Sequence, residues 1–387
     1  MANYARAPVT FVAGQGCELI DVSGKRYLDF VAGIAVCALG HAHPAISSAI
    51  IEQAQTLVHC SNLYGHEPAS ILAQKLAQLS GFNRVFFCNS GTEANEAAIK
   101  LARKRAFCAG EQRRTILSCT GSFHGRTLGA LAATANPHYH EGFEPLPAGF
   151  ASTPFNDIAA LHSNINHTTA AFVVEPIQGE SGVHPASRAF LEAARQLCDE
   201  HGALLVFDEV QSGVGRTGKF FAFQHFGVRS DVVTLAKALA NGLPIGAMLV
   251  DEPLAAVFQP GDHGSTFGGS PVPCAAALAH LRVRDELHLD DHVQAMGARL
   301  CAALQELHKA FPAIISEPRG LGLMLGVSVK APHDATKLVS DAREKGLLIN
   351  SAGGNSLRFT PPLVIDSASI TRLHRVLGAI FEETATV

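Results

Sequence analysis

The pattern of apolar and polar positions changes after about residue 45, and the change predicts two kinds of structure. Residues 9–31 alternate apolar and polar positions around glycines, which is typical of short antiparallel strands joined by turns. Further along, short apolar runs alternate with stretches of helical periodicity. We expect strands at 84–88, 115–119, 171–174, 203–207 and 232–235, and helices at 92–107 and 188–201.

The later strands are nearly continuous apolar runs, which predicts a mostly parallel α/β sheet covered by helices on both faces. After about residue 275, a long helical stretch leads into a smaller α+β region. We therefore expect a large α/β domain over residues 44–275 and a small domain split between residues 1–43 and 276–387. Ligands of α/β sheets bind beyond the carboxyl ends of the strands, so residues that follow strands are the candidates for chemistry.

Composition narrows the classes of function. Of the 387 residues, 47% are hydrophobic and 17% are charged, which argues against disorder. A net charge of -4 without a basic stripe argues against nucleic-acid binding, and no apolar run is long enough for a membrane span. Nine cysteines without a CxxC pair favour reduced thiols in a cytoplasmic protein. The histidines lack the clustered spacing of metal ligands, so we predict no metal site.

Two polar residues contrast with the apolar runs. The strand at 203–207 continues directly into Asp208, although a buried carboxylate is costly unless it has a partner. Lys237 follows in the segment TLAKALANG. A protonated ring nitrogen would be a partner for Asp208, and a lysine nearby could form a Schiff base. From these two residues alone, an ordinary Asp–Lys ion pair is the simpler interpretation.

Two glycine-containing turns follow strands. Ser90, Gly91 and Thr92 lead into the helix at 92–107, and free N–H groups at a helix start suit a phosphate. Helix capping by Ser90 or Thr92 accounts for the same residues. The segment GVGRTG at 213–218 matches a dinucleotide-binding pattern. We reject that interpretation because the glycines begin too late after the strand and no clean helix follows them.

The remaining candidates lie in loops. Phe123 offers a flat face and Arg126 a bidentate grip for a carboxylate in GSFHGRT. Arg358 lies among apolar residues in SLRFTPPL, so its charge needs a carboxylate from the protein or from a ligand. The ordinary explanations are that Phe123 is a core aromatic residue and that Arg126 is a surface arginine. Three further polar residues lie in EPIQGESG and GDHGSTFGG: Glu180, Ser265 and Thr266.

Taken in order, these segments resemble the class III (ornithine-type) aminotransferases, which use pyridoxal phosphate. The resemblance rests on SGTEAN, GSFHGRT, EPIQGE, FDEVQSGVGRTG, LAKALANGLPIG, HGSTFGG and LRFTPPL, and it covers nearly the whole chain. SNLYGHEP at 61–68 and PGDHGSTFGG at 260–269 are most similar to the acetylornithine-specific members. The sequence departs from the family pattern at Ser181, at Ser270 and in LAKALANG, and none of these changes removes a group that the chemistry requires.

The resemblance implies the fold of pyridoxal-phosphate-dependent transferases of fold type I, with a seven-stranded sheet. It also implies how the cofactor would be held. Lys237 would bind it covalently, and Asp208 would keep its ring nitrogen protonated. Phe123 and Val210 would sandwich the ring, and Gln211 would hydrogen-bond its phenolic oxygen. The phosphate would be held by the residues at the helix start and by one from the other subunit of a homodimer: Ser90, Gly91, Thr92 and Thr266.

For the substrates, the resemblance implies two carboxylate sites in one cavity. Arg126 would bind the α-carboxylate of an acylated ornithine. Arg358 would bind the carboxylate of 2-oxoglutarate next to the keto group. Glu180 would mask Arg358 while the first substrate is bound, and Ser265 would lie near the substrate.

The reaction implied is transamination of N2-acetylornithine with 2-oxoglutarate to N-acetylglutamate 5-semialdehyde and glutamate, in cytoplasmic arginine biosynthesis. Succinylornithine and 4-aminobutyrate aminotransferases are close alternatives. A different reaction is that of a mutase or racemase of the same fold, which dependence on 2-oxoglutarate would exclude. A non-catalytic scaffold is a further alternative, and the presence of Lys237, Asp208 and Arg358 argues against it. We align Ile34 with a tyrosine of ornithine-specific members; its apolar side chain favours a neutral, acylated α-nitrogen over a free ammonium.

Overall fold

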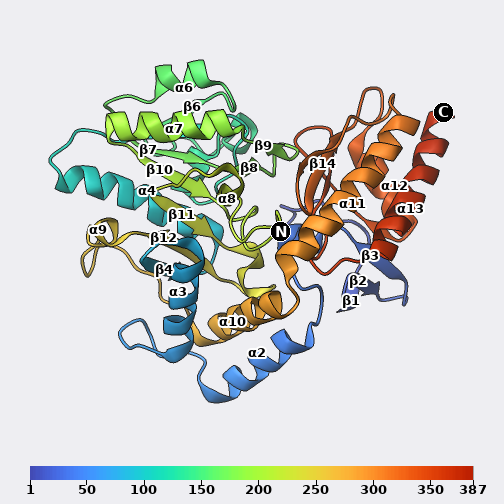
Figure 1. Ribbon diagram of the computed structural model, residues 1–387, viewed down its shortest axis with the longest axis horizontal. Coiled ribbons are helices and arrows are strands. Elements are labelled where there is room, and N and C mark those ends of the chain that lie inside the picture. Colours follow the sequence, from blue (N-terminus) through green and yellow to red (C-terminus); the bar gives the residue numbers. More distant parts are fainter. Residues whose placement is uncertain (387) are drawn as a thin grey trace.

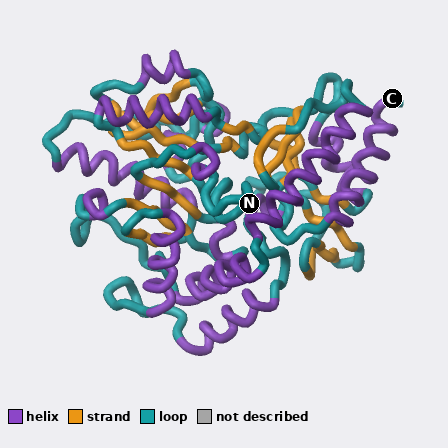
Figure 2. Tube along the Cα trace, viewed as in Figure 1, coloured by secondary structure: helices purple, strands orange, loops and turns teal. Residues whose placement is uncertain are grey.

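The computed structural model describes residues 1–386. It has a large lobe built around an extended sheet and a smaller lobe packed against its side (Figure 1). The tube view shows helices on the outside of both lobes and strands within them (Figure 2). In the described residues, no helix combines the length and the apolar character that crossing a membrane requires.

The large lobe contains a seven-stranded sheet in the order β4-β12-β11-β10-β7-β5-β6. Its strands are β4 (Arg84–Cys88), β5 (Thr115–Cys119), β6 (Phe150–Thr153), β7 (Thr169–Val174), β10 (Leu204–Asp208), β11 (Val232–Leu235) and β12 (Gly246–Val250). β12 pairs antiparallel with both of its neighbours, and the other adjacent pairs are parallel. The mostly parallel sheet predicted from the sequence is therefore confirmed.

Both faces of this sheet are buried, as its continuous apolar strands require. Successive residues of β10 enter different clusters: Val206 packs with the α4 side, whereas Leu205 and Phe207 pack with the α7 side. The helices of the large lobe are α2 (Pro44–Thr56), α3 (Glu67–Ser80), α4 (Gly91–Cys108), α5 (Leu128–Ala133), α6 (Ile158–Asn164), α7 (Arg188–His201), α8 (Phe223–Phe226), α9 (Glu252–Ala255) and the 3-10 helices η1 (Pro137–Tyr139) and η2 (Lys237–Ala240). A small hairpin joins β8 (Ile177–Gln178) and β9 (His184–Pro185).

The small lobe has two sheets and three long helices. One sheet has the order β1-β2-β3-β15, with β1 (Phe11–Gln15), β2 (Glu18–Asp21), β3 (Arg26–Asp29) and β15 (Leu347–Leu348). The other has the order β13-β14-β17-β16, with β13 (Arg319–Leu321), β14 (Met324–Ser328), β16 (Asn350–Ala352) and β17 (Ser356–Phe359). The helices are α11 (Leu289–Ala310), α12 (Ala335–Glu344) and α13 (Ser367–Ala385). Because β3 and β15 pair in parallel, the N-terminal and C-terminal segments share one sheet.

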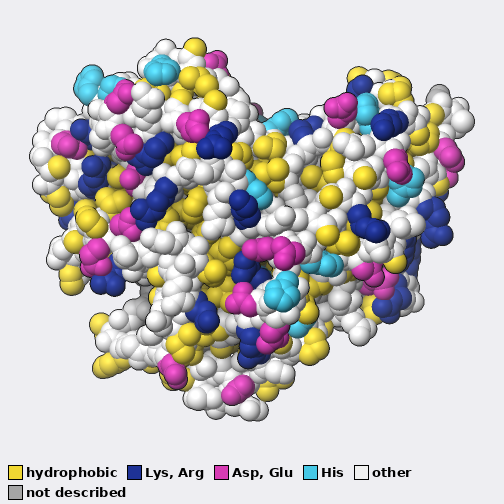
Figure 3. Space-filling model, in the orientation of Figure 1, with side chains coloured by type: hydrophobic (Ala, Val, Ile, Leu, Met, Phe, Trp, Pro, Cys, Tyr) yellow, Lys and Arg dark blue, Asp and Glu magenta, His cyan; other side chains and the backbone are white. Residues whose placement is uncertain are grey.

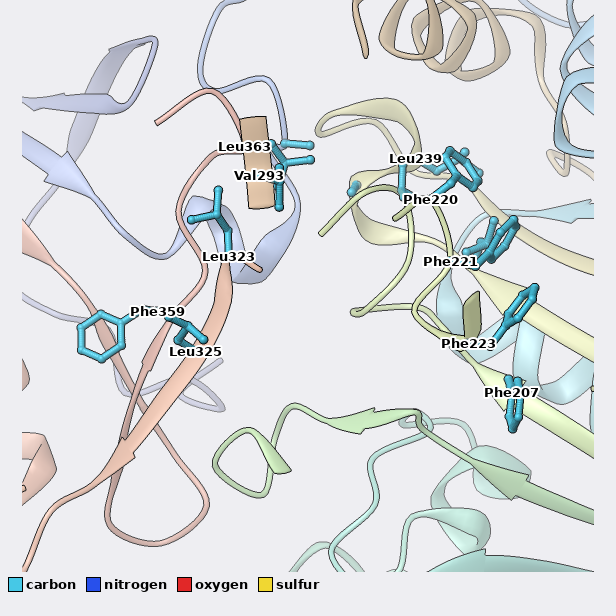
Figure 4. Close-up of a cluster of buried hydrophobic side chains, with 14 of the residues drawn as sticks. Phe207, Phe220, Phe221, Phe223, Leu239, Val293, Leu323, Leu325, Phe359 and Leu363 are labelled. Carbon is cyan, nitrogen blue, oxygen red and sulfur yellow. The ribbon is translucent and has the colours of Figure 1, made fainter. Parts of the chain in front are cut away.

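Helix α10 (Pro271–Glu286) connects the lobes and runs through the predicted domain boundary at residue 275, while the boundary at residue 43 lies immediately before α2. A single cluster of buried apolar residues continues from the large lobe into the small one. In Figure 4, Phe207 and Phe223 lie on the large-lobe side, and Leu325 and Phe359 lie on the small-lobe side. On the face shown in Figure 3, acidic and basic side chains are interspersed.

One short element has the opposite hand to every other helix described. α1 (Ala32–Ala35) has positive φ angles throughout: 49° at Ala32, 65° at Gly33 and Ile34, and 61° at Ala35. This conformation costs roughly 1–2 kcal/mol for each residue other than glycine, so the surroundings must hold it. The carboxylate of Asp29 does so in part by accepting hydrogen bonds from the N–H groups of Val31 and Ala32.

Candidate active site

A cavity of about 380 Å³ lies where the loops that follow the central strands meet. Ten of the predicted site residues line it: Ser90, Gly91, Thr92, Phe123, Arg126, Glu180, Asp208, Val210, Gln211 and Lys237. They come from segments that are far apart in the sequence, so the sheet topology assembles this group of side chains. The cavity lies beyond the carboxyl ends of parallel strands, as expected for an α/β sheet.

The carboxylate of Asp208 is held by hydrogen bonds rather than by a lysine. Its Oδ2 atom accepts from Asn95 Nδ2 at 2.7 Å and faces His124 Nδ1 at 2.8 Å, while Oδ1 accepts from the N–H of Val210 at 3.0 Å. Asn95 is fixed in turn by Thr234, whose hydroxyl donates to Asn95 Oδ1 at 2.8 Å. Within residues 1–386, Asp208 and Lys237 form no ion pair, so the simple Asp–Lys interpretation is wrong.

Lys237 begins η2 with a φ of 37°, directly after β11. Its side chain is partly buried and makes no hydrogen bond or ion pair within the described chain. Burial lowers the pKa of Lys237 below its ordinary value, although the charges of Glu180 and Asp208 act in the opposite direction. A buried lysine that loses its proton readily is suited to act as a nucleophile.

The start of α4 lies at one end of the cavity. Ser90 caps this helix, since its hydroxyl accepts from the N–H of Glu93 at 3.3 Å. The capping interpretation of Ser90 is therefore confirmed. The N–H groups of Gly91 and Thr92 have no acceptor among the described residues, which leaves them available to an anion. A Cβ atom at Gly91 would lie 2.7 Å from Val210 Cγ1, so only glycine fits between the helix and Val210.

An ion pair between a buried arginine and a partly exposed glutamate lies beside Lys237. Arg358 is 1% exposed, and its Nη1 atom donates to Glu180 Oε1 at 2.7 Å. The same nitrogen donates to Gln211 Oε1 at 3.1 Å, and Gln211 Nε2 donates to Glu180 Oε1 at 3.0 Å. Burial alone would raise the pKa of Glu180, but the charges of Arg358 and Lys237 outweigh it and keep that pKa low. Glu180 is thus part of the cavity wall and not a solvated loop acid.

Ser265 and Thr266 lie outside the cavity of a single chain. Ser265 accepts a hydrogen bond from Asn89 Nδ2 at 3.0 Å, which places it at the rim because Asn89 lines the cavity. Thr266 is exposed and borders a separate small hollow beside His59 and Asn62. The role of Thr266 toward a second subunit therefore remains a prediction.

Comparison with known proteins identifies the family. A family model described as aminotransferase class-III matches residues 1–381. The chain belongs to the class-III aminotransferases. It is 49% identical over 381 residues to the acetylornithine aminotransferase of Methanocaldococcus jannaschii, covering 98% of this chain and 95% of that protein. It is 47% identical over 382 residues to the acetylornithine aminotransferase of Gloeobacter violaceus, with the same shares covered.

Solved structures agree with this assignment. The ornithine aminotransferase of Toxoplasma gondii ME49 superposes with a TM-score of 0.94 at 34% identity, covering 99% of this chain and 93% of that one. An acetylornithine aminotransferase of Elizabethkingia anophelis superposes with a TM-score of 0.87 at 33% identity, covering 99% and 96%. This class-III aminotransferase therefore has fold type I and depends on pyridoxal phosphate.

The cavity of this class-III aminotransferase fits that cofactor. Lys237 is a partly buried amine without a hydrogen-bond or ion-pair partner among the described residues, and Asp208 is a carboxylate whose orientation is fixed by Asn95 and His124. Phe123 and Val210 add apolar surface, and Gly91 leaves open the space that a side chain would fill. When bound, pyridoxal phosphate supplies an electron-accepting ring that stabilises negative charge on the substrate carbon.

Several residues of the cavity were not predicted from the sequence. Asn95 and His124 were missed because their contact with Asp208 exists only in the folded chain, although a buried asparagine in an apolar helix face is a usable signal. Glu175 is also buried, and its Oε2 atom accepts from the N–H of Phe123 at 3.2 Å. Burial, with the charge of Asp208 added to it, raises the pKa of Glu175 well above its ordinary value.

The apolar wall near the small lobe also differs from the expectation. Ile34 is 41% exposed and is not among the residues that line the cavity. Val36, which follows the left-handed turn, lines it instead. Within one chain the side chain of Ile34 does not line the cavity, so its contact with the substrate stays a prediction. An apolar residue is still present at this wall.

Proposed function

We propose that this enzyme transfers the δ-amino group of N2-acetylornithine to 2-oxoglutarate and yields N-acetylglutamate 5-semialdehyde and glutamate, a step of arginine biosynthesis. The observation that carries the proposal is the closed pair of Arg358 and Glu180 at 2.7 Å, in which Glu180 lines the cavity and covers Arg358, while Arg126 lines the same cavity without an acidic partner among the described residues. Two substrates with carboxylates in different positions need two arginines, one of which can be masked. The names of the relatives support the acylated substrate.

The residues of the chain then have distinct tasks. Lys237 would hold the cofactor covalently, and its amine would take the proton from the substrate carbon that bears the amino group. Asp208 would hold a proton on the ring nitrogen, and its own orientation is fixed by Asn95 and His124. Phe123 and Val210 would contact the ring, while Ser90, Gly91 and Thr92 would bind the phosphate.

The two half-reactions use the arginines differently. Arg126 binds the α-carboxylate of acetylornithine, while Glu180 neutralises Arg358 and keeps its guanidinium from attracting α-amino acids. When 2-oxoglutarate enters, Glu180 moves aside and the carboxylate next to the keto group takes its place on Arg358. The exchange replaces one charged hydrogen bond by another, so Arg358 is never left buried without a partner.

We also propose that the enzyme is cytoplasmic and that its domains divide at residues 43 and 275. We further propose that it is a homodimer, in which Thr266 of the partner subunit completes the phosphate site. Support for the dimer comes from an exposed apolar surface formed by Val58, Leu63, Tyr64 and Phe267. His59 and Phe267 pack at 5.5 Å, so its two segments are contiguous. Sedimentation should give twice the chain mass, and Leu63→Glu should yield inactive monomers; a wild-type monomer with full activity would contradict this.

Single half-reactions test the proposed substrate. N-acetylornithine, N-succinylornithine, ornithine and 4-aminobutyrate are each mixed with the cofactor-loaded enzyme, and the cofactor absorbance is followed before and after 2-oxoglutarate is added. We expect kcat/KM to favour acylated over free ornithine at least about tenfold, which corresponds to roughly 1.4 kcal/mol. Equal efficiency on the two, or faster reaction with 4-aminobutyrate, would contradict the proposal. Turnover without 2-oxoglutarate would indicate a mutase or a racemase.

A further inference from the structure

The arginine proposed to bind the first substrate is held between aromatic rings. Arg126 follows β5 in the loop that also carries Phe123. Its guanidinium carbon lies 4.1 Å from the centroid of the Tyr139 ring and 5.3 Å from the centroid of the Phe123 ring. The two rings meet edge to face at 6.0 Å and 86°. Within residues 1–386, the guanidinium forms no ion pair and no hydrogen bond, so these rings are its principal support.

Tyr139 is itself held in place. It ends η1, which Asn136 caps by accepting from the N–H of His138 at 3.2 Å. The next residue, His140, directs Nε2 toward the carbonyl oxygens of Leu131 and Thr134, at 3.0 and 2.7 Å. These carbonyls belong to the end of α5, the helix that begins directly after the loop carrying Arg126. The ring and the arginine are thus fixed to the same helix.

The geometry suits a carboxylate in a specific way. A cation over the face of an aromatic ring is attracted by the negative charge of that face, and a guanidinium stacked flat keeps its N–H groups in its own plane. Those N–H groups stay free to bind a carboxylate through two parallel hydrogen bonds. Without the ring, an exposed arginine would sample many rotamers, and binding would have to select one of them.

We propose that Tyr139 is a positioning residue that orients Arg126 toward the cavity and thereby selects amines that carry a carboxylate at the end far from the reacting amino group. The inference rests on the proposed function, since it takes Arg126 as the site of that carboxylate. It goes further in assigning the selectivity to a pair of residues, one of which never contacts the reacting atoms. The hydroxyl of Tyr139 makes no hydrogen bond within the described chain, so the ring face alone carries the effect.

The test compares three substitutions at Tyr139 in the cofactor-loaded enzyme. Tyr139→Phe keeps the ring, Tyr139→Leu keeps apolar volume without a ring, and Tyr139→Ala removes both. Each variant reacts in single turnover with N-acetylornithine and with n-butylamine, which has an amino group on a four-carbon chain but no carboxylate. The quantity measured is the ratio of the two efficiencies, together with the half-saturating concentration and the limiting rate for N-acetylornithine.

We expect Tyr139→Ala and Tyr139→Leu to lower the ratio about tenfold, through a higher half-saturating concentration at an unchanged limiting rate. Tyr139→Phe should stay within about twofold of the wild type, and n-butylamine should react equally well with all variants. An unchanged ratio in Tyr139→Ala would overturn the inference, as would an equal loss of efficiency with n-butylamine. A wild-type ratio in Tyr139→Leu would also overturn it, because side-chain volume would then be responsible. A lowered ratio in Tyr139→Phe would do the same, because the hydroxyl would then be responsible.

Arg126→Ala separates a failure of this inference from a failure of the proposed function. If Arg126→Ala lowers the ratio strongly while Tyr139→Ala does not, Arg126 binds the carboxylate without help from Tyr139, and only the positioning role is overturned. If Arg126→Ala leaves the ratio unchanged, the carboxylate binds elsewhere, and both the proposed role of Arg126 and the role of Tyr139 are overturned. Thermal unfolding of each variant shows whether the fold is intact.

Discussion

At the scale of single residues, the site depends on charges that are buried with their partners already in place. Asp208 accepts hydrogen bonds from Asn95 and contacts His124, and Arg358 meets Glu180 and Gln211. Such preorganised groups need little rearrangement during the reaction, which is the usual source of electrostatic catalysis. Removing one charge should therefore affect the rate far more than the fold.

Asp208→Asn replaces the carboxylate by an amide of nearly the same shape. The amide cannot hold a proton on the ring nitrogen, so the ring accepts electrons poorly. We expect the rate of the half-reaction with N-acetylornithine to fall about 100-fold or more, which corresponds to a few kcal/mol of transition-state stabilisation. Stopped-flow absorbance measures this rate. Near-normal rates would mean that the buried carboxylate has a structural role only.

Glu180→Ala and Arg358→Ala should affect opposite half-reactions. Without Glu180, Arg358 stays open, and glutamate and other α-amino acids become better amine donors while the advantage of N-acetylornithine shrinks. Without Arg358, the 2-oxoglutarate half-reaction should slow about 10- to 150-fold, the equivalent of one charged hydrogen bond, while the first half is largely spared. Single-turnover rates for both halves measure this. Parallel losses in both variants would indicate a static ion pair that only supports the loop.

At the scale of elements, strand ends could be predicted from the sequence because apolar runs stop where polar groups begin. The predicted strands at 84–88, 115–119 and 232–235 and the predicted helix at 188–201 match β4, β5, β11 and α7. β6 and β12 were not predicted: β6 has two exposed central residues, and β12 starts with a glycine. α1 could not be predicted either, because nothing local in Ala-Gly-Ile-Ala favours a left-handed turn.

The candidate site likewise contains residues that a local pattern marks and residues that only the fold brings together. Residues that directly follow a strand, such as Asp208, stand out by their chemistry in the sequence. Asn95 and His124 contact Asp208 only when α4 and the loop after β5 are brought to the end of β10, so a local pattern can mark Asn95 as a buried asparagine but cannot predict either contact. Thr266 lies outside the cavity of one chain and cannot be assigned from that chain alone.

The start of α4 allows a test at this scale. Gly91→Ala would place a methyl group 2.7 Å from Val210 Cγ1, so the helix start and Val210 must move apart. Overpacking of this kind costs about 1–3 kcal/mol, and we expect roughly tenfold weaker binding of pyridoxal phosphate, measured by absorbance titration. Adding Val210→Ala should restore part of the affinity because it removes the overlapping methyl groups. A double variant no better than Gly91→Ala would show that the helix start tolerates no side chain for another reason.

At the scale of the whole molecule, a few polar contacts reinforce the apolar core shared by the lobes. Arg216, in the segment first compared with dinucleotide sites, is fully buried and donates to the carbonyl of Leu323 in the small lobe at 3.2 Å. Burial lowers the pKa of Arg216 to about 9. His41, which precedes α2, contacts the carboxylate of Asp29 at the end of β3 at 2.7 Å. The first contact joins the two lobes, and the second ties the segment before α2 to the sheet of the small lobe.

The pair of His41 and Asp29 should make stability depend on pH. The hydrogen bond to Asp29 raises the pKa of His41 from its ordinary value of 6.5 to about 9, while partial burial acts in the opposite direction. A raised pKa stabilises the fold fully below about pH 6.5, and this contribution is lost as the pH rises through 9. We expect Tm to fall over this window in the wild type and to fall less in His41→Asn. If Tm falls equally with pH in the wild type and in His41→Asn, His41 is not the source of the pH dependence.

The left-handed turn at α1 reverses the usual mutational rule for glycine. Ile34→Gly would remove roughly 1–2 kcal/mol of backbone strain and lose about 0.5–1 kcal/mol through greater freedom of the unfolded chain. Ile34 is 41% exposed, so part of its side chain is buried, and Ile34→Ala is the reference because it loses nearly the same contacts. We expect the free energy of unfolding of Ile34→Gly to exceed that of Ile34→Ala by about 0.5–1 kcal/mol in urea titrations. In the right-handed α2, Ile51→Gly should instead be less stable than Ile51→Ala by about 1 kcal/mol. Differences of the same sign at both positions would mean that the turn holds no strain; opposite signs would identify α1 as a site where stability can be engineered while the core and the catalytic residues stay unchanged.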